Sequence, residues 1–164
     1  MFFSISSIGC ALPGQYGLSR SLGSTHGVNM QTATVKWAGQ QQFECVTPSG
    51  HPVRLDSDRE RNTAPGPMEM LLVALGGCTA TDVVVILEKK RQKLDSLEVV
   101  VSGERRKETP SVWVKIEILY MLRGELDEKA VRDAIELSES KYCSVSAMLR
   151  KTADVTFRYE IAKN

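Results

Sequence analysis

Residues 67–87 read PMEMLLVALGGCTATDVVVIL and form the most hydrophobic stretch of the chain. In the helix that this stretch predicts, apolar residues occur on nearly every side, which is typical of a buried helix. Pro67 suits the first turn of a helix, because its missing N–H would be unpaired there. A single thiol, Cys78, lies in the middle of the stretch beside two glycines. We therefore expect a buried central helix and some group that approaches this sulfur.

The composition indicates one globular domain. The chain has 164 residues, of which 42% are hydrophobic, and a net charge of +1. Balanced charge without a basic patch argues against nucleic-acid binding. A membrane span needs about 20 predominantly apolar residues with few or no charges. Glu69, Asp82 and the paired glycines interrupt the apolar run, so we expect no membrane span.

The cysteines point to a reducing compartment and not to a metal site. Cys10, Cys45, Cys78 and Cys143 show no CxxC spacing, and the chain has only two histidines. That set predicts neither a zinc site nor another cofactor. The beginning of the sequence lacks a basic region followed by a clean apolar core, so we expect no secretory signal. In the cytoplasm, where we place the protein, well-placed cysteines are more often catalytic or redox-active than structural.

The order of predicted elements gives an α+β fold. Residues 1–29 are rich in serine and glycine and predict a flexible tail, and residues 30–164 predict a single domain. Alternating apolar residues predict strands over 33–37, 43–46, 52–55, 97–101, 112–120 and 155–161. An amphipathic helix follows Asp127, a good N-cap. The order is β-β-β-α-β-β-α-β, with antiparallel sheets around the central helix.

The predicted strands and helices of one chain contain too few residues to cover a central helix that is apolar on every side. The simplest solution is a second copy of the chain. We therefore expect a homodimer in which the central helices pack together and the sheets close the outer faces.

Two cysteines lie at helix-associated positions, Cys78 in the central helix and Cys143 at the start of a short helix near Ser144. The positive end of a helix dipole lowers the pKa of a thiol at a helix N-terminus. Peroxide chemistry needs a thiolate, a cation that keeps it ionised, a pocket and a second thiol that resolves the sulfenic acid. The residues by themselves are weak evidence for such a pair and favour two inert core cysteines.

Residues 67–78, followed by Asp82-Val83-Val84, resemble the first signature of the OsmC/Ohr family. Residues 143–149, CSVSAML, resemble the second signature, in which the cysteine is usually followed by Pro-Val-Ser. The resemblance covers roughly residues 30–164 and includes the order of strands and helices. Within the family, Gly-Gly-Cys and the following Asp-Val-Val resemble the YhfA-like branch most.

The resemblance implies an intertwined homodimer with two active sites at the subunit interface. It implies a thiol-dependent peroxidase that reduces organic hydroperoxides to alcohols. Cys78 would be the peroxidatic thiolate, and Cys143 would resolve its sulfenic acid as a Cys78–Cys143 disulfide. A dithiol reductant, such as a lipoylated protein, would then reduce that disulfide.

Two departures from the family pattern leave the activating residues open. Strongly active members have a glutamate ten residues before the first cysteine, where this chain has Met68. Glu69 lies nine before, and one residue along a helix is about 100° of rotation, so Glu69 is also readable as a charge that suits the helix N-terminus. Arg59 fits the activating arginine best, with Arg54 and Arg61 as competitors.

Three functions therefore remain open at the level of sequence. The first is an organic-hydroperoxide reductase. The second is a protein of this fold that acts as a thiol redox sensor, or binds a small apolar molecule, with little peroxidase activity. The third is a purely structural dimer. It is the least favoured of the three, because packing gives no reason to retain both signature cysteines.

Overall fold

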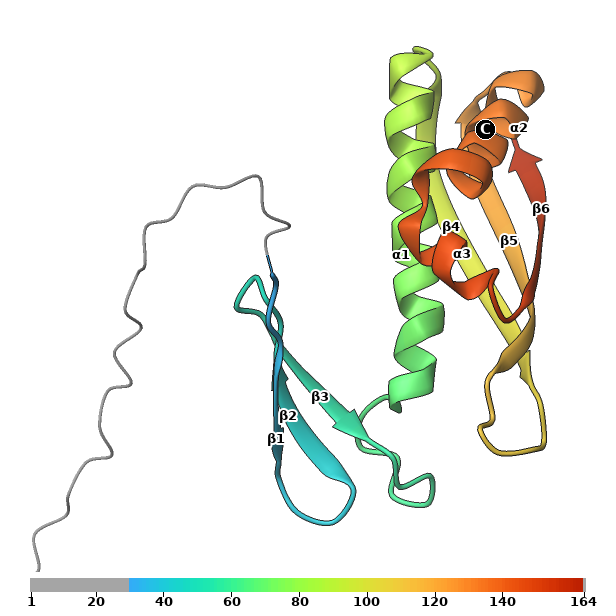
Figure 1. Ribbon diagram of the computed structural model, residues 1–164. Coiled ribbons are helices and arrows are strands. Elements are labelled where there is room, and N and C mark those ends of the chain that lie inside the picture. Colours follow the sequence, from blue (N-terminus) through green and yellow to red (C-terminus); the bar gives the residue numbers. More distant parts are fainter. Residues whose placement is uncertain (1–29, 164) are drawn as a thin grey trace, which may run out of the picture. The chain divides into compact units, whose positions relative to one another are not determined.

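A computed structural model describes residues 30–163, and the predicted tail over residues 1–29 lies outside the described residues. The predicted α+β class is confirmed (Figure 1). The elements are β1 (Thr34–Trp37), β2 (Gln42–Val46), β3 (Pro52–Asp56), α1 (Pro67–Lys89), β4 (Lys93–Arg105), β5 (Trp113–Glu125), α2 (Glu128–Leu137), the π-helical turn η1 (Ser138–Tyr142), α3 (Ser144–Leu149) and β6 (Asp154–Ala162).

The first three strands form an antiparallel sheet in the order β1-β2-β3. Its two turns need glycine, because Gly39 and Gly50 have φ values of 105° and 88°. The sheet leaves large apolar side chains in contact with solvent, and Trp37 is 71% exposed. In an antiparallel sheet the apolar face normally packs against a core. The face of this sheet that carries Trp37 is instead largely uncovered.

The other sheet has the order β4-β5-β6. β4 and β5 form the predicted antiparallel hairpin. The expectation that the sheets are antiparallel throughout is wrong for β6, which runs parallel to β5 and pairs Lys115 with Asp154. Parallel neighbours need a crossover connection of a dozen residues or more. The segment containing α2, η1 and α3 supplies that crossover.

Helix α1 packs against β4 and α2 (Figure 1). Gly76 permits the close approach to the sheet, because a Cβ there would lie 3.2 Å from Cγ2 of Val101. The adjacent Gly77 would meet nothing within 4 Å. One glycine therefore serves packing inside the chain, and the other faces open space.

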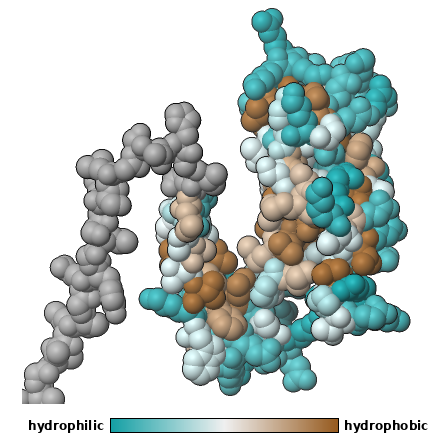
Figure 2. Space-filling model, viewed as in Figure 1, coloured by the Kyte–Doolittle hydropathy of each residue, from teal (hydrophilic) through white to brown (hydrophobic). Residues whose placement is uncertain are grey.

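Only one side of α1 is buried within the chain. The buried residues are Leu75, Gly76, Thr79, Val83 and Leu87. Opposite them, Val73, Gly77, Thr81 and Val85 are exposed at intervals of four residues, and we call this set the open stripe. Val73 is 61% exposed, and apolar side chains show at the surface over this helix (Figure 2). By length and composition alone α1 could cross a membrane.

The crossover begins as the sequence predicts. Asp127 caps α2 by accepting a hydrogen bond from the Ala130 N–H at 2.8 Å, and Val131 and Ile135 are buried. The predicted helix continues to about Lys141, whereas α2 ends at Leu137 and η1 follows. Short π-helical segments occur frequently at functional sites. Here η1 leads directly into Cys143, which takes the capping place expected for Ser144 in α3.

Candidate active site

Cys78 and Cys143 come together although they lie far apart in the sequence. The two Sγ atoms and one carboxylate oxygen of Asp82 all lie within 4.8 Å of one another. Helix α1 supplies Cys78 and Asp82, which are four residues apart and therefore share a helix face. The turn between η1 and α3 supplies Cys143. We call these three residues the thiol cluster.

The two thiols of the cluster differ in environment. Cys78 is half-buried, whereas Cys143 is only 3% exposed. Burial, together with a hydrogen bond to Cys78, raises the pKa of Cys143 to about 12. The Ser146 N–H donates to its sulfur at 3.3 Å and lowers the pKa by a smaller amount. The expectation that a helix N-terminus lowers the pKa is therefore wrong for Cys143, because α3 is short and burial dominates.

A buried polar network lies beside Cys143, with the Glu139 carboxylate at its centre. That carboxylate accepts hydrogen bonds from Tyr120 at 3.0 Å, Thr79 at 3.2 Å, Ser146 at 2.8 Å and Arg150 at 2.9 Å. Because Arg150 also forms an ion pair with it, the buried charge is compensated. Among the described residues, no buried side-chain nitrogen or oxygen lacks a hydrogen-bond partner.

The same network reaches the thiol cluster through Ser138. The Ser138 hydroxyl donates to Oδ2 of Asp82 at 2.9 Å, and its carbonyl accepts from the Cys143 N–H at 2.9 Å. Thr79 joins Ser138 to Tyr120, whose pKa is raised mainly by burial. The network therefore fixes both the carboxylate and the backbone that carries the buried thiol.

Sequence reasoning did not assign roles to this network. Asp82 and Ser146 lie inside the two signature stretches, and that location is the one signal which could have singled them out. Glu139 and Arg150 read as ordinary surface charges, since nothing in their local pattern predicts burial. Their partners come from four different elements, so only the folded chain brings them together.

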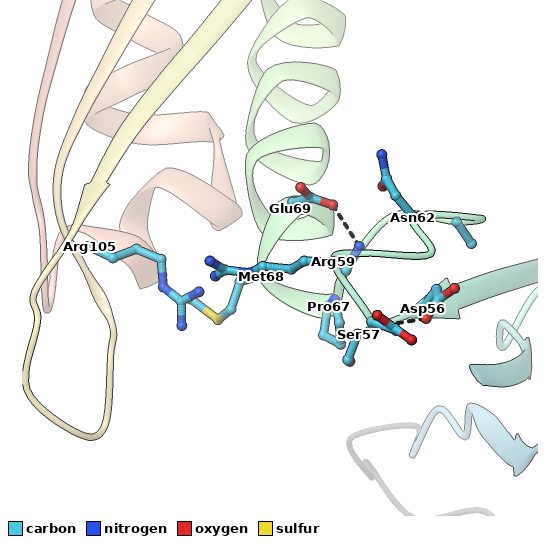
Figure 3. A pocket seen from close by; sticks show the side chains of 11 residues that line it. Asp56, Ser57, Arg59, Asn62, Pro67, Met68, Glu69 and Arg105 are labelled. Carbon is cyan, nitrogen blue, oxygen red and sulfur yellow. Dashed lines mark hydrogen bonds between the residues drawn. The ribbon is translucent and has the colours of Figure 1, made fainter. Parts of the chain in front are cut away.

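The predicted activating residues lie at the beginning of the same helix, Glu69 in its first turn and Arg59 in the loop before it. Arg59 and Glu69 line a pocket at the first turn of α1, together with Met68 and Arg105 (Figure 3). We call it the first-turn pocket. Glu69 accepts a hydrogen bond from the Gly66 N–H at 2.6 Å, which is a capping contact.

The loop that carries Arg59 is anchored by Asp56. Its carboxylate accepts hydrogen bonds from the Thr63 hydroxyl at 2.5 Å and from the Asp58 N–H at 2.9 Å. These bonds, that from Thr63 most of all, lower the pKa of Asp56 to about 2. The loop therefore has a fixed shape on the side of Asp56, while the Arg59 side chain remains exposed.

One chain does not bring Glu69 to the thiols. Nine residues separate Glu69 from Cys78 along α1, which corresponds to about 13 Å at a rise of about 1.5 Å per residue. Of the competing arginines, Arg54 is exposed and lies 3.9 Å from Glu44, and Arg61 is also exposed. Within one chain, the structure thus unites the two predicted cysteines and keeps Arg59 and Glu69 in a separate pocket.

Comparisons with known proteins identify relatives of the chain in sequence and in fold. A family model described as OsmC-like protein matches residues 60–158. Protein YhfA of Escherichia coli K12 is 42% identical over 130 residues, which cover 79% of this chain and 96% of YhfA. A hypothetical protein from Aquifex aeolicus is 31% identical, with a TM-score of 0.76 over 84% of this chain and 99% of that one.

A more distant structure has the same fold. It is described as an organic hydroperoxide resistance protein OsmC and predicted redox protein from Legionella pneumophila. It is 14% identical, with a TM-score of 0.63 over 82% of this chain and 98% of its own. At this identity the similarity shows the fold alone.

Proposed function

Because the chain belongs to the OsmC-like protein family, we propose that it is a thiol-dependent peroxidase that reduces organic hydroperoxides to alcohols. One observation carries the proposal: a half-buried thiol, Cys78, faces a buried thiol, Cys143, with the two sulfurs within 4.8 Å. We propose that α1 is a helix of the protein core and not a membrane span, although it is long and apolar enough to be one. We propose a cytoplasmic location, where the described cysteines remain as free thiols.

The chemistry assigns one step to each thiol. The Cys78 thiolate attacks the distal peroxide oxygen, the O–O bond breaks, and the alcohol leaves after it takes a proton. The resulting sulfenic acid is attacked by the Cys143 sulfur, which forms the disulfide and releases water. A small dithiol or a lipoylated protein then reduces the disulfide by exchange. Each turnover therefore converts one hydroperoxide and one dithiol into one alcohol, one water and one disulfide.

The open stripe on α1 supports a homodimer. A soluble protein rarely leaves several apolar side chains, such as Val73 and Val85, exposed along one helix face without a partner. Gly77 lies between them along the helix, and a Cβ added there would meet nothing within 4 Å, so another backbone has room to approach. We assign this space to the α1 of a second copy, which places Cys78, one residue beyond Gly77, at the edge of the interface.

The second copy also solves the problem of the missing cation. Thiol-based peroxide chemistry uses a cation beside the nucleophilic sulfur, whereas the charged group placed beside Cys78 in one chain is the carboxylate of Asp82. Glu69 is too far along its own helix to act on its own Cys78. We propose that Arg59 and Glu69 of one copy complete the site of the other copy.

A direct assay tests the activity. Purified protein is given cumene hydroperoxide with dihydrolipoamide, and Cys78→Ser serves as the control. We expect turnover that the control lacks, and a Cys78–Cys143 disulfide in the mass spectrum of the oxidised protein. Turnover no faster than that of Cys78→Ser, or a disulfide that involves Cys45, refutes the proposal.

Mixed dimers test the shared site. Cys78→Ser and Arg59→Ala are each expected to be inactive as homodimers. Co-refolded together, they should regain activity, because a mixed dimer has one site with both an intact Cys78 and an intact Arg59 from the other copy. If no activity returns, the proposal that the two copies share a site is wrong.

The interface itself is tested by Val73→Asp, with Val100→Asp as the matched control. Val100 is 40% exposed on β4, and it lies on the sheet face opposite to Val101, which approaches α1. Sedimentation should show monomers for Val73→Asp and dimers for Val100→Asp. Dimers in both samples contradict an interface through the open stripe.

A thiol redox sensor is the second candidate. The observation that favours it is Asp82, because the charged side chain beside both sulfurs is acidic and not the basic one that a fast thiolate nucleophile uses. A sensor would form the same disulfide stoichiometrically and would turn over slowly with every dithiol. The turnover assay separates the two functions, since both predict the disulfide and only the peroxidase predicts sustained consumption of hydroperoxide.

A further inference from the structure

The thiol cluster has the composition of a metal site. Cys78, Cys143 and Asp82 each offer one ligand atom, and all three atoms lie within 4.8 Å of one another. Tetrahedral zinc binds thiolate sulfur at about 2.3 Å and carboxylate oxygen at about 2.0 Å, which places ligand atoms about 3.5–3.8 Å apart. Small side-chain rotations are therefore enough to place all three around one ion.

From this geometry we infer that the reduced protein binds one thiophilic divalent cation, such as Zn²⁺, between Cys78, Asp82 and Cys143. The fourth position of the tetrahedron would be open to water. The spacing of cysteines and histidines along the sequence gave no sign of this, because short zinc motifs place ligands close together in sequence. Here the crossover brings Cys143 back against α1 from a distant part of the chain.

The surroundings of the cluster support a cation more than they support a bare dithiol. Ser138 donates to Oδ2 of Asp82 at 2.9 Å, and such hydrogen bonds orient carboxylates that bind metals. Cys78 and Asp82 are half-buried, which leaves the ion a path from solvent. Metal binding would displace the protons of both thiols. The two thiolates and the carboxylate would then carry three negative charges, which a divalent cation largely neutralises.

This inference does not rest on the proposed peroxidase activity. The two are connected, however, since an ion held by the Cys78 thiolate removes the nucleophile from peroxide chemistry. Metal binding is measurable without any peroxide, so failure of one proposal is distinguishable from failure of the other.

Zinc binding to the reduced full-length protein tests the inference. Zn²⁺ is titrated against a chromophoric chelator, in the wild type and in a Cys10→Ser background, because Cys10 lies outside the described residues. We expect one ion per chain, affinity at least 100-fold weaker in Cys78→Ser or Cys143→Ser, and affinity about tenfold weaker in Asp82→Asn, which corresponds to about 1.4 kcal/mol. Cys45→Ser is the matched control and should bind like its parent.

Cobalt(II) gives a second readout that reports on the ligands themselves. The Co²⁺-loaded protein should show thiolate-to-cobalt charge-transfer absorption together with the d–d spectrum of a tetrahedral ion. Circular dichroism checks that each variant is folded. Binding that is unchanged in Asp82→Asn, binding lost with Cys45→Ser, or no binding beyond that of Cys78→Ser overturns the proposed site.

Discussion

Two regions along α1, the thiol cluster and the first-turn pocket, are built in opposite ways. The thiol cluster lies in the middle of the helix, beside a buried network in which Glu139 has four hydrogen-bond partners. The first-turn pocket lies at the beginning of the helix, and its charged groups Arg59 and Glu69 are exposed. The chain thus fixes the surroundings of the two thiols by itself and leaves the charged groups of the second region exposed. Reactive sulfur needs fixed surroundings, whereas groups that act across an interface need to be accessible.

Replacing Glu139 and Glu69, one at a time, should give the largest difference in stability between the two regions. Glu139→Ala is expected to lower the free energy of unfolding by about 3 kcal/mol, because it leaves Arg150 and several buried hydroxyl groups without their acceptor. Glu69→Ala removes only an exposed capping contact and should cost less than about 1 kcal/mol. Urea denaturation measures both values, and equal losses would show that the two regions are equally structural.

The paired glycines distinguish the two faces of α1. Gly76→Leu should lower the free energy of unfolding by about 2 kcal/mol through overpacking against Val101. Gly77→Leu has open space within its own chain and should leave the folded protomer intact. It should instead weaken the association of two copies across the open stripe.

Urea denaturation and sedimentation velocity, run on both glycine variants, read out these effects separately. A Gly77→Leu protein that remains fully dimeric would mean that no second backbone approaches there.

The difference between the two thiols should appear as a difference in alkylation rate. In reduced protein treated with a chelator, iodoacetamide at pH 8 should modify Cys78 at least tenfold faster than Cys143, a difference of about 1.4 kcal/mol in barrier. The reason is that Cys143 is buried and, with its pKa raised to about 12, almost wholly protonated. Peptide mass spectrometry at successive times gives both rates. Faster modification of Cys143 would reverse the roles assigned to the two thiols.

The smallest expected effect concerns the loop beside the first-turn pocket. Its hydrogen bonds lower the pKa of Asp56 from 3.8 to about 2, so Asp56 stabilises the fold above pH 4. That stabilisation is lost as the pH falls from about 4 toward 2. The stability difference between the wild type and Asp56→Asn should therefore shrink over this range in urea denaturation. A difference that stays constant would mean that the Asp56 carboxylate does not hold the loop.

Local sequence patterns predicted the helices and strands, but they could not predict contacts between residues that are far apart in the sequence. Capping by Asp127 and burial of Val131 follow from spacing along one helix. The direction of β6 does not, because parallel and antiparallel strands both show alternation. The expectation that Cys78 and Cys143 act together came from resemblance to a family. Glu139 escaped notice, since a buried carboxylate is recognisable only by partners on other elements.

The parallel pairing of β6 with β5 also bears on how the site forms. The pairing joins Lys115 to Asp154, so the chain must close a long crossover before this ladder exists. Long closures carry an entropic cost and fold slowly. Because Cys143 lies on that crossover and Cys78 lies on α1, the two sulfurs meet only once the crossover has packed against α1. A newly made chain therefore carries two ordinary, separate thiols, and a dithiol centre arises only in a molecule that has finished folding.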